Sequence, residues 1–161
     1  MTTLPNAIFL DRDGVINREK GDYITRPEDF ELLPHALNHI KALHKKGVKI
    51  FVITNQGGIA KGLYTLETLQ QIHSNMLTSI RENGGDITEI FFCPHHSVKG
   101  NCLCRKPGSI LVEKALAKYA LDPAQTLFIG DKPRDMQAAA AAGVRGVLIE
   151  ENTDWGFVLE L

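Results

Sequence analysis

Two aspartates follow a short apolar run near the start of the chain. Asp11 and Asp13 come directly after residues 7–10 and are separated by one arginine. Carboxylates this close repel one another unless a cation or a proton offsets their charge. A hard divalent cation such as Mg²⁺ prefers oxygen ligands of this kind. The pair therefore indicates a cation site, although aspartates at strand ends are also common in ordinary turns.

Polar groups follow other apolar runs in the same way. The groups concerned are Thr54, Asn55 and Gln56 at the end of residues 48–54, Asp131 and Lys132 after residues 126–129, and the cations Arg105 and Lys106 before a predicted helix. Each group alone is typical of turns, helix caps or solvated surfaces. Together, at successive strand ends, they indicate one shared site for a metal ion and a phosphate group.

Phosphoryl chemistry is what this set of residues favours. A cation between Asp11 and Asp131 would let a carboxylate approach an anionic phosphoryl group, so Asp11 could attack phosphorus and form an aspartyl-phosphate. Asp13 points another way in extended chain and is better placed to protonate the leaving oxygen and then to activate water. The groups that could hold the phosphoryl oxygens are the Thr54 hydroxyl, the Asn55 backbone amide and the Lys106 ammonium.

Strand and helix signals alternate along the chain and would position these groups. Strands are predicted for residues 7–10, 48–54, 90–92, 126–129 and 144–149, from short apolar runs. Four helices are predicted between these strands. Three of them end at Gly47, Gly84 and Gly143, and the fourth covers residues 110–120. This alternation favours a three-layer, Rossmann-like α/β fold with a mostly parallel sheet. Ligands of such folds bind at the carboxyl ends of the strands, where the polar groups would meet.

The bulk composition predicts a single domain over residues 1–161. The net charge of −1 argues against a nucleic acid partner or an acidic membrane surface. No apolar run reaches the roughly 18–20 residues of a membrane span. Residues 1–6 lack the basic and apolar segments of a signal peptide, so we expect a cytoplasmic protein. We also expect it to be monomeric.

All three cysteines of the chain lie within twelve residues, beside a histidine. Cys93 and His95 form one pair, Cys102 and Cys104 form another, and six residues separate the pairs. Three thiolates and one imidazole suit a tetrahedral, structural Zn²⁺ site with no position left for a substrate. His96 is a competing ligand, and free thiols beside an incidental histidine are the simpler alternative. A zinc-binding loop would fix the two cations that directly follow Cys104.

The polar motifs resemble those of the haloacid dehalogenase superfamily of phosphatases. The four matching segments, in order, are Asp11-Arg-Asp-Gly, Thr54-Asn, Lys106 and Gly130-Asp131-Lys-x-x-Asp135. The resemblance implies that Asp11 is the nucleophile and that Asp13 is the general acid and base. It also implies that the Asp11 side chain, the Asp13 backbone carbonyl and Asp131 would bind Mg²⁺.

Longer segments are similar to one branch of that superfamily, the heptose-bisphosphate phosphatases and the related histidinol phosphatases. The matching segments are Asp11-Arg-Asp-Gly-Val-Ile-Asn17, Thr54-Asn-Gln-Gly-Gly-Ile-Ala-Lys-Gly62, Cys93-Pro-His-His96 and Cys102-Leu-Cys-Arg-Lys-Pro107. The branch has no large cap domain, so short loops would contact the substrate, and its pattern favours His95 as the zinc ligand. Besides the catalytic set Asp11, Asp13, Thr54 and Lys106, the expected substrate-binding residues are Arg12, Glu19, Lys20, Gly21, Asp22, Asn55, Gln56, Arg105 and Lys132.

The resemblance implies a small phosphorylated sugar as substrate, with hydrolysis of D-glycero-D-manno-heptose 1,7-bisphosphate at the 7-position through an aspartyl-phosphate. Histidinol phosphate is the alternative substrate. Bifunctional histidine-biosynthesis enzymes carry a further dehydratase domain, and residues 1–161 contain none, which favours the heptose. Transfer to another acceptor would use the same intermediate, although an uncapped site leaves that intermediate open to water. A zinc-stabilised phosphoprotein-binding module without activity is the remaining alternative.

Overall fold

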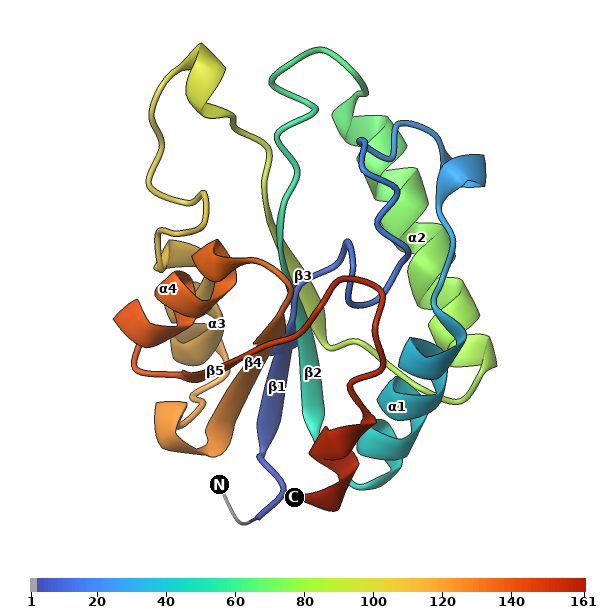
Figure 1. Ribbon diagram of the computed structural model, residues 1–161, viewed down its shortest axis with the longest axis vertical. Helices are drawn as coiled ribbons and strands as arrows, with labels where there is room; N and C mark the ends of the chain where they lie inside the picture. Colours follow the sequence, from blue (N-terminus) through green and yellow to red (C-terminus); the bar gives the residue numbers. More distant parts are fainter. Residues whose placement is uncertain (1–2) are drawn as a thin grey trace.

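Five strands form one parallel sheet in the order β3-β2-β1-β4-β5, within residues 3–161 that the computed structural model describes (Figure 1). The strands are β1 (Ala7–Leu10), β2 (Lys49–Asn55), β3 (Glu89–Cys93), β4 (Thr126–Gly130) and β5 (Arg145–Leu148). Leu10 of β1 lies beside Val52 of β2 and Ile129 of β4. The carboxyl ends of the three central strands are therefore close together, and the residues after them leave the sheet at one edge.

Helices cover both faces of the sheet and give the molecule three layers (Figure 1). The helices α1 (Pro34–Lys45) and α2 (Leu66–Glu82) lie on one face, and α3 (Ile110–Lys118) and α4 (Pro133–Ala141) lie on the other. Successive residues of a strand point to opposite faces. Ile8 therefore belongs to the core cluster that contains residues of α1 and α2, and Phe9 belongs to the cluster that contains residues of α3 and α4. Burial on both faces explains why β1 is apolar throughout.

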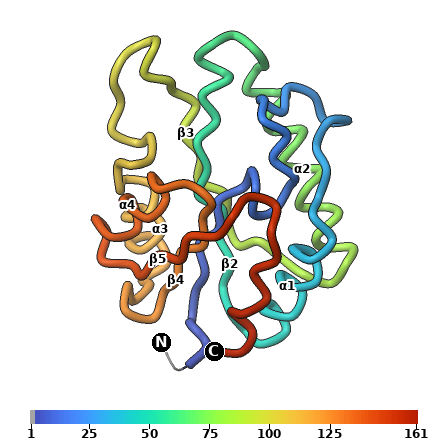
Figure 2. The backbone as a smooth tube through the Cα atoms, viewed as in Figure 1, coloured from blue at the N-terminus to red at the C-terminus, as the bar shows by residue number. Residues whose placement is uncertain are grey.

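Loops, rather than a cap domain, follow the strands in the described part of the chain. Residues 11–33, 56–65 and 94–109 contain turns and the 3-10 helices Pro27–Asp29 and Ser97–Lys99. The loops after β2 and β3 both extend beyond the carboxyl edge of the sheet (Figure 2). They touch at Gly57, where a Cβ atom would lie 2.9 Å from Nη1 of Arg105 and 3.0 Å from the backbone oxygen of His95.

The last residues of the chain support the loop after β1. Trp155 is fully buried and donates its Nε1 hydrogen to the backbone oxygen of Val15 at 3.0 Å. Asn152 pairs with the backbone of Glu19, accepting from its nitrogen at 2.6 Å and donating to its oxygen at 3.0 Å. The 3-10 helix Gly156–Glu160 then packs against α1. The C-terminal segment thus anchors a loop that begins with the two aspartates.

The predicted fold class is confirmed, and the elements differ from the prediction only at their ends. β2 starts and ends one residue later than predicted. α3 ends at Lys118 rather than at residue 120, because Ala120 has a φ of +49° and cannot continue a right-handed helix. The short 3-10 helix Ser97–Lys99 is not among the predicted elements.

None of the helices within residues 3–161 is long and apolar enough to cross a membrane. The signal-peptide prediction covers residues 1–6, of which Met1 and Thr2 lie outside the described residues.

Candidate active site

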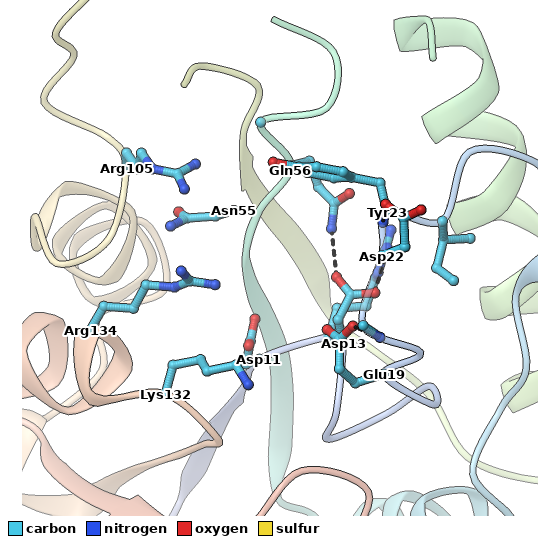
Figure 3. Close-up of a pocket in the computed structure, with 14 residues that line it drawn as sticks. Asp11, Asp13, Glu19, Asp22, Tyr23, Asn55, Gln56, Arg105, Lys132 and Arg134 are labelled. Carbon is cyan, nitrogen blue, oxygen red and sulfur yellow. Dashed lines mark hydrogen bonds and ion pairs between the residues drawn. The ribbon is translucent and has the colours of Figure 1, made fainter. Parts of the chain in front are cut away.

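A pocket of about 250 Å³ opens at the carboxyl edge of the sheet (Figure 3). Asp11, directly after β1, lies between its two sides. Arg105, Lys132 and Arg134 extend from one side, and Asp13 lies on the other. The strand ends that were predicted to meet therefore do so around one cavity.

Lys106 is a buried cation between two carboxylates. Its Nζ lies 2.9 Å from Oδ1 of Asp11 and 2.7 Å from Oδ1 of Asp135, and it donates to the backbone oxygen of Ile53 at 2.7 Å. The side chain is only 1% exposed. Burial disfavours its charge, but Asp11 and Asp135 outweigh this and raise the pKa of Lys106 above its ordinary value. Lys106 therefore stays an ammonium ion beside the proposed nucleophile.

A third carboxylate, that of Asp131, lies close to the two that contact Lys106. One carboxylate oxygen from each of Asp11, Asp131 and Asp135 can be chosen so that all lie within 4.8 Å of one another. Burial raises the pKa of Asp11 to about 8, Lys106 opposes this rise, and the other carboxylates add to it. Two ammonium groups, those of Lys106 and Lys132, contact these three carboxylates, and Lys132 is also paired with Glu151, so the cluster has a deficit of positive charge that a cation would fill.

Asp131 has the free oxygen atoms that such a cation needs. Within residues 3–161 its Oδ1 is buried without a hydrogen-bond partner, while Oδ2 has an ion pair with Lys132 at 3.2 Å. Gly14 has a φ of +85°, and a Cβ atom there would lie 2.6 Å from Oδ2 of Asp131. Glycine therefore leaves space directly at the carboxylate. Hard oxygen donors with room around them fit Mg²⁺.

Asp13 is held by three donors on the other side of the pocket (Figure 3). Its Oδ1 accepts from Arg12 at 2.8 Å and from Asn17 at 2.9 Å, and its Oδ2 accepts from Gln56 at 3.0 Å. Burial alone would raise the pKa of Asp13, but the Arg12 charge and these hydrogen bonds bring it below its ordinary value. The two motif aspartates therefore have different environments, which is the usual basis for giving them different chemical roles.

Arg12 contacts both Asp13 and a histidine of α2. The guanidinium is 1% exposed and lies 5.5 Å from the centre of the Phe30 ring. Its Nη1 lies 3.2 Å from Nε2 of His73 on α2. Burial and the Arg12 charge lower the pKa of His73 to about 3, so the imidazole is neutral and can accept this hydrogen bond. The sequence motif contains Arg12 but gives no sign of His73, which lies 61 residues away.

Asn55 joins the end of β2 to the loop that carries Lys106. Its Nδ2 donates to the backbone oxygen of Lys106 and its Oδ1 accepts from the backbone nitrogen, both at 3.0 Å. Thr54 is buried, and its Oγ1 accepts from Gln56 at 2.9 Å. These contacts fix the loop against the strand end and hold Lys106 beside Asp11.

Most of the predicted substrate-binding residues line the pocket. Those that do are Asp11, Arg12, Asp13, Glu19, Gly21, Asp22, Asn55, Gln56, Arg105 and Lys132. Thr54 and Lys106 are buried next to it instead. Lys20 does not line the pocket, because its Nζ donates to the backbone oxygen of Asp29 at 2.9 Å. Four lining residues were not predicted, namely Tyr23, Ile24, Gly57 and Arg134.

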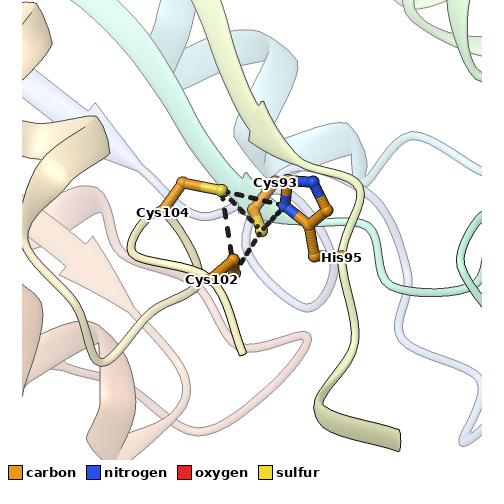
Figure 4. A group of neighbouring side chains, drawn as sticks. All are labelled: Cys93, His95, Cys102 and Cys104. Carbon is orange, nitrogen blue, oxygen red and sulfur yellow. Dashed lines mark hydrogen bonds between the residues drawn. The ribbon is translucent and has the colours of Figure 1, made fainter. Parts of the chain in front are cut away.

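The three cysteines and His95 converge in the loop after β3 (Figure 4). The Cys102 sulfur lies 3.7 Å from that of Cys93 and 3.8 Å from that of Cys104. Zn–S bonds of about 2.3 Å in a tetrahedron place sulfurs about 3.8 Å apart, so these distances suit zinc. The pair Cys93 and Cys104 is closer, at 3.0 Å, but too long for a disulfide bond of about 2.05 Å.

The chemistry of these ligands also favours a metal. Nδ1 of His95 lies 3.5 Å from the sulfur of Cys93 and 3.2 Å from that of Cys104. Burial raises the pKa of Cys93 to about 12, so a cation is needed to hold this group as a thiolate. His96 has another partner, since its Nδ1 accepts from the backbone nitrogen of Val98 at 3.2 Å. The geometry therefore favours His95 as the fourth ligand.

We expect His95→Gln and His96→Gln to separate these two histidines. Loss of a ligand should release zinc from His95→Gln and lower kcat/KM by about 10- to 100-fold, because displacement of Arg105 and Lys106 by about 1 Å is costly. His96→Gln should keep one zinc ion per chain and near-normal turnover. Metal analysis after dialysis, together with kcat/KM, measures both. Equal zinc retention in the two variants would contradict the assignment.

Comparisons with known proteins agree with these features. A model of the HAD-hydrolase-like family matches residues 103–154. The D-glycero-alpha-D-manno-heptose-1,7-bisphosphate 7-phosphatase of Photorhabdus laumondii is 38% identical over 142 residues, which cover 84% of this chain and 77% of that protein. The D-glycero-beta-D-manno-heptose-1,7-bisphosphate 7-phosphatase of Helicobacter pylori is 39% identical over 144 residues, covering 89% and 82%.

A solved structure is similar over the same extent. The crystal structure of D,D-heptose 1,7-bisphosphate phosphatase from B. bronchiseptica, complexed with magnesium and phosphate, superposes with a TM-score of 0.85 at 37% identity. The match covers 89% of this chain and 79% of that one. The similarity therefore includes most of this chain and most of the length of each of these relatives.

Proposed function

The chain belongs to the haloacid dehalogenase-like phosphatases, and on this premise we propose that it hydrolyses D-glycero-D-manno-heptose 1,7-bisphosphate at the 7-position. The observation that carries the proposal is the convergence of the motifs, with Nζ of Lys106 2.9 Å from Oδ1 of Asp11 and Asp131 beside them. The names of the relatives in Photorhabdus laumondii and Helicobacter pylori support the heptose bisphosphate as substrate.

The first chemical step is assigned to Asp11. Its carboxylate attacks the phosphorus of the 7-phosphate, the bond to the sugar oxygen breaks, and an aspartyl-phosphate forms. The ammonium group of Lys106 stabilises charge on the transferring oxygens and lowers the pKa of Asp11, which favours its ionised form. Mg²⁺ held by Asp11, Asp131 and the Asp13 backbone carbonyl would neutralise the charge that otherwise keeps a carboxylate and a phosphate apart.

Proton transfer is assigned to Asp13. It gives a proton to the leaving sugar oxygen and then takes one from the water that attacks the aspartyl-phosphate, which regenerates Asp11. The pKa of Asp13 lies below its ordinary value in the free protein. A phosphate group bound nearby raises the pKa of a carboxyl group by repulsion, so substrate binding itself favours the protonated acid.

A direct comparison of substrates tests the proposal. We expect kcat/KM with Mg²⁺ to be highest for heptose 1,7-bisphosphate, measured on both anomers, and much lower for histidinol phosphate. A clear preference for histidinol phosphate would overturn the substrate. Release of the phosphoryl group mainly to an added acceptor sugar, rather than to water, would overturn hydrolysis. The cytoplasmic location and monomeric state of the enzyme stay predictions.

A further inference from the structure

The two sides of the pocket carry opposite charges (Figure 3). Arg105, Lys132 and Arg134 lie on one side, and Glu19 and Asp22 lie on the other. Asp11 lies between the sides, so the reacting phosphoryl group would be central. A second anionic group on the substrate is attracted by the first side and repelled by the other.

Lys132 contributes little of this attraction, because carboxylates already neutralise it. Its Nζ lies 2.8 Å from Oε2 of Glu151 and 3.2 Å from Oδ2 of Asp131. A cation with two such neighbours has little charge to offer to a substrate. The attraction for an anion must therefore come from the two arginines on the same side.

Arg105 and Arg134 differ from most arginines of the protein in lacking a carboxylate partner. Four other arginines have ion pairs within 3.0 Å, namely Arg12 with Asp13, Arg18 with Glu31, Arg26 with Asp29 and Arg81 with Asp86. Within residues 3–161, neither Arg105 nor Arg134 has such a pair, and both line the pocket. Two uncompensated guanidinium groups facing one cavity form a site for an anion.

The surroundings of each guanidinium strengthen this argument. Nε of Arg134 is buried and has no hydrogen-bond partner among the described residues. Nη1 of Arg105 donates to the backbone oxygen of His95 at 3.2 Å, which directs the group while leaving its other donors free. A buried donor without a partner is costly, and a bound phosphate oxygen would remove that cost.

We propose that Arg134, together with Arg105, binds the non-reacting phosphate group of the substrate, which makes Arg134 a residue that determines specificity for bisphosphates. The proposal rests on the proposed function, since it assumes that another phosphate reacts at Asp11. Guanidinium groups present planar pairs of donors that match phosphate oxygens. The carboxylates of Glu19 and Asp22 face the sugar side, where they can accept hydrogen bonds from hydroxyl groups.

Arg134→Met tests the proposal when two substrates are compared that differ only in the distal phosphate. We expect the ratio of kcat/KM for heptose 1,7-bisphosphate to that for heptose 7-phosphate to fall about 10- to 100-fold, the loss typical of a charged hydrogen-bonding partner. Arg134→Lys keeps the charge without the paired donors and should give an intermediate ratio. Arg145→Met removes an exposed arginine from β5 and should leave the ratio unchanged.

The ratio separates specificity from general damage. An equal loss on both substrates would mean that Arg134 acts on the reacting phosphoryl group or on folding, and it would overturn the proposal, as would an unchanged ratio. The same comparison with fructose 1,6-bisphosphate and fructose 6-phosphate separates a failure of the role proposed for Arg134 from a failure of the proposed function. If the wild type turned over neither heptose compound, the proposed function would fail, and the fructose pair would still decide the role of Arg134.

Discussion

Asp11→Asn is expected to lower kcat by at least about 10⁴-fold, because it removes the nucleophile on which both chemical steps depend. Asparagine has nearly the same shape as a protonated aspartate. Without metal, burial raises the pKa of Asp11 to about 8, so at pH 7 the wild-type residue is already largely neutral. The variant should therefore fold as stably as the metal-free wild type, with Lys106 still paired to Asp135 at 2.7 Å.

Acid quenching with substrate labelled at the reacting phosphate measures the intermediate directly. The wild type should carry label on the protein, and Asp11→Asn should carry none. Asp86→Asn is the matched control, since the same change falls on a carboxylate that pairs with Arg81 away from the pocket. It should keep activity within about twofold, as surface changes usually do. Label on Asp11→Asn, or turnover near that of the control, would exclude Asp11 as the nucleophile.

The fold could be predicted from the sequence because the main signals are local. β1, β2 and β4 are buried on both faces and therefore appear as short, nearly continuous apolar runs. The start of α2 has a local signal of the same kind, because Thr65 is a preferred capping residue and accepts from the backbone nitrogen of Thr68 at 3.1 Å. Once the sheet is parallel, the strand ends share an edge, and the position of the pocket follows.

The parts of the site that were missed depend on contacts between distant segments. Arg134 looks like an ordinary residue in the first turn of α4, and only the packing of that helix directs it to the pocket. Tyr23 also lines the pocket, and its ring centre lies 5.1 Å from Nζ of Lys61, a residue of the loop after β2. Lys20, two residues from Asp22, points instead to Asp29. Side-chain direction within a loop cannot be deduced from sequence spacing, because no regular period governs it.

Lys106→Met is expected to destabilise the metal-free protein by about 3–5 kcal/mol at pH 9, the cost of leaving buried carboxylates without their cation. The change keeps an unbranched side chain, one atom shorter, but removes the charge that lies 2.9 Å from Asp11 and 2.7 Å from Asp135. Turnover should also fall by at least about 10³-fold, since the same ammonium stabilises the transferring phosphoryl group. Urea unfolding in buffer without Mg²⁺ measures the loss of stability.

The loss should be smaller at pH 5 than at pH 9. Lys106 lowers the pKa of Asp11, so its removal lets that pKa rise further above about 8. A carboxyl group whose pKa is raised by folding binds more protons in the folded state, so its penalty grows from the ordinary pKa of 3.8 up to the folded pKa. In the wild type this growth stops near pH 8, whereas in the variant it continues above pH 8. Lys118→Met is the control, because Lys118 pairs with Glu89 at 2.9 Å on the surface and is 58% exposed. Its removal should cost at most about 1 kcal/mol at either pH. If Lys106→Met unfolded at the same urea concentration as this control, the buried cation would not be what stabilises Asp11 and Asp135 in the folded protein.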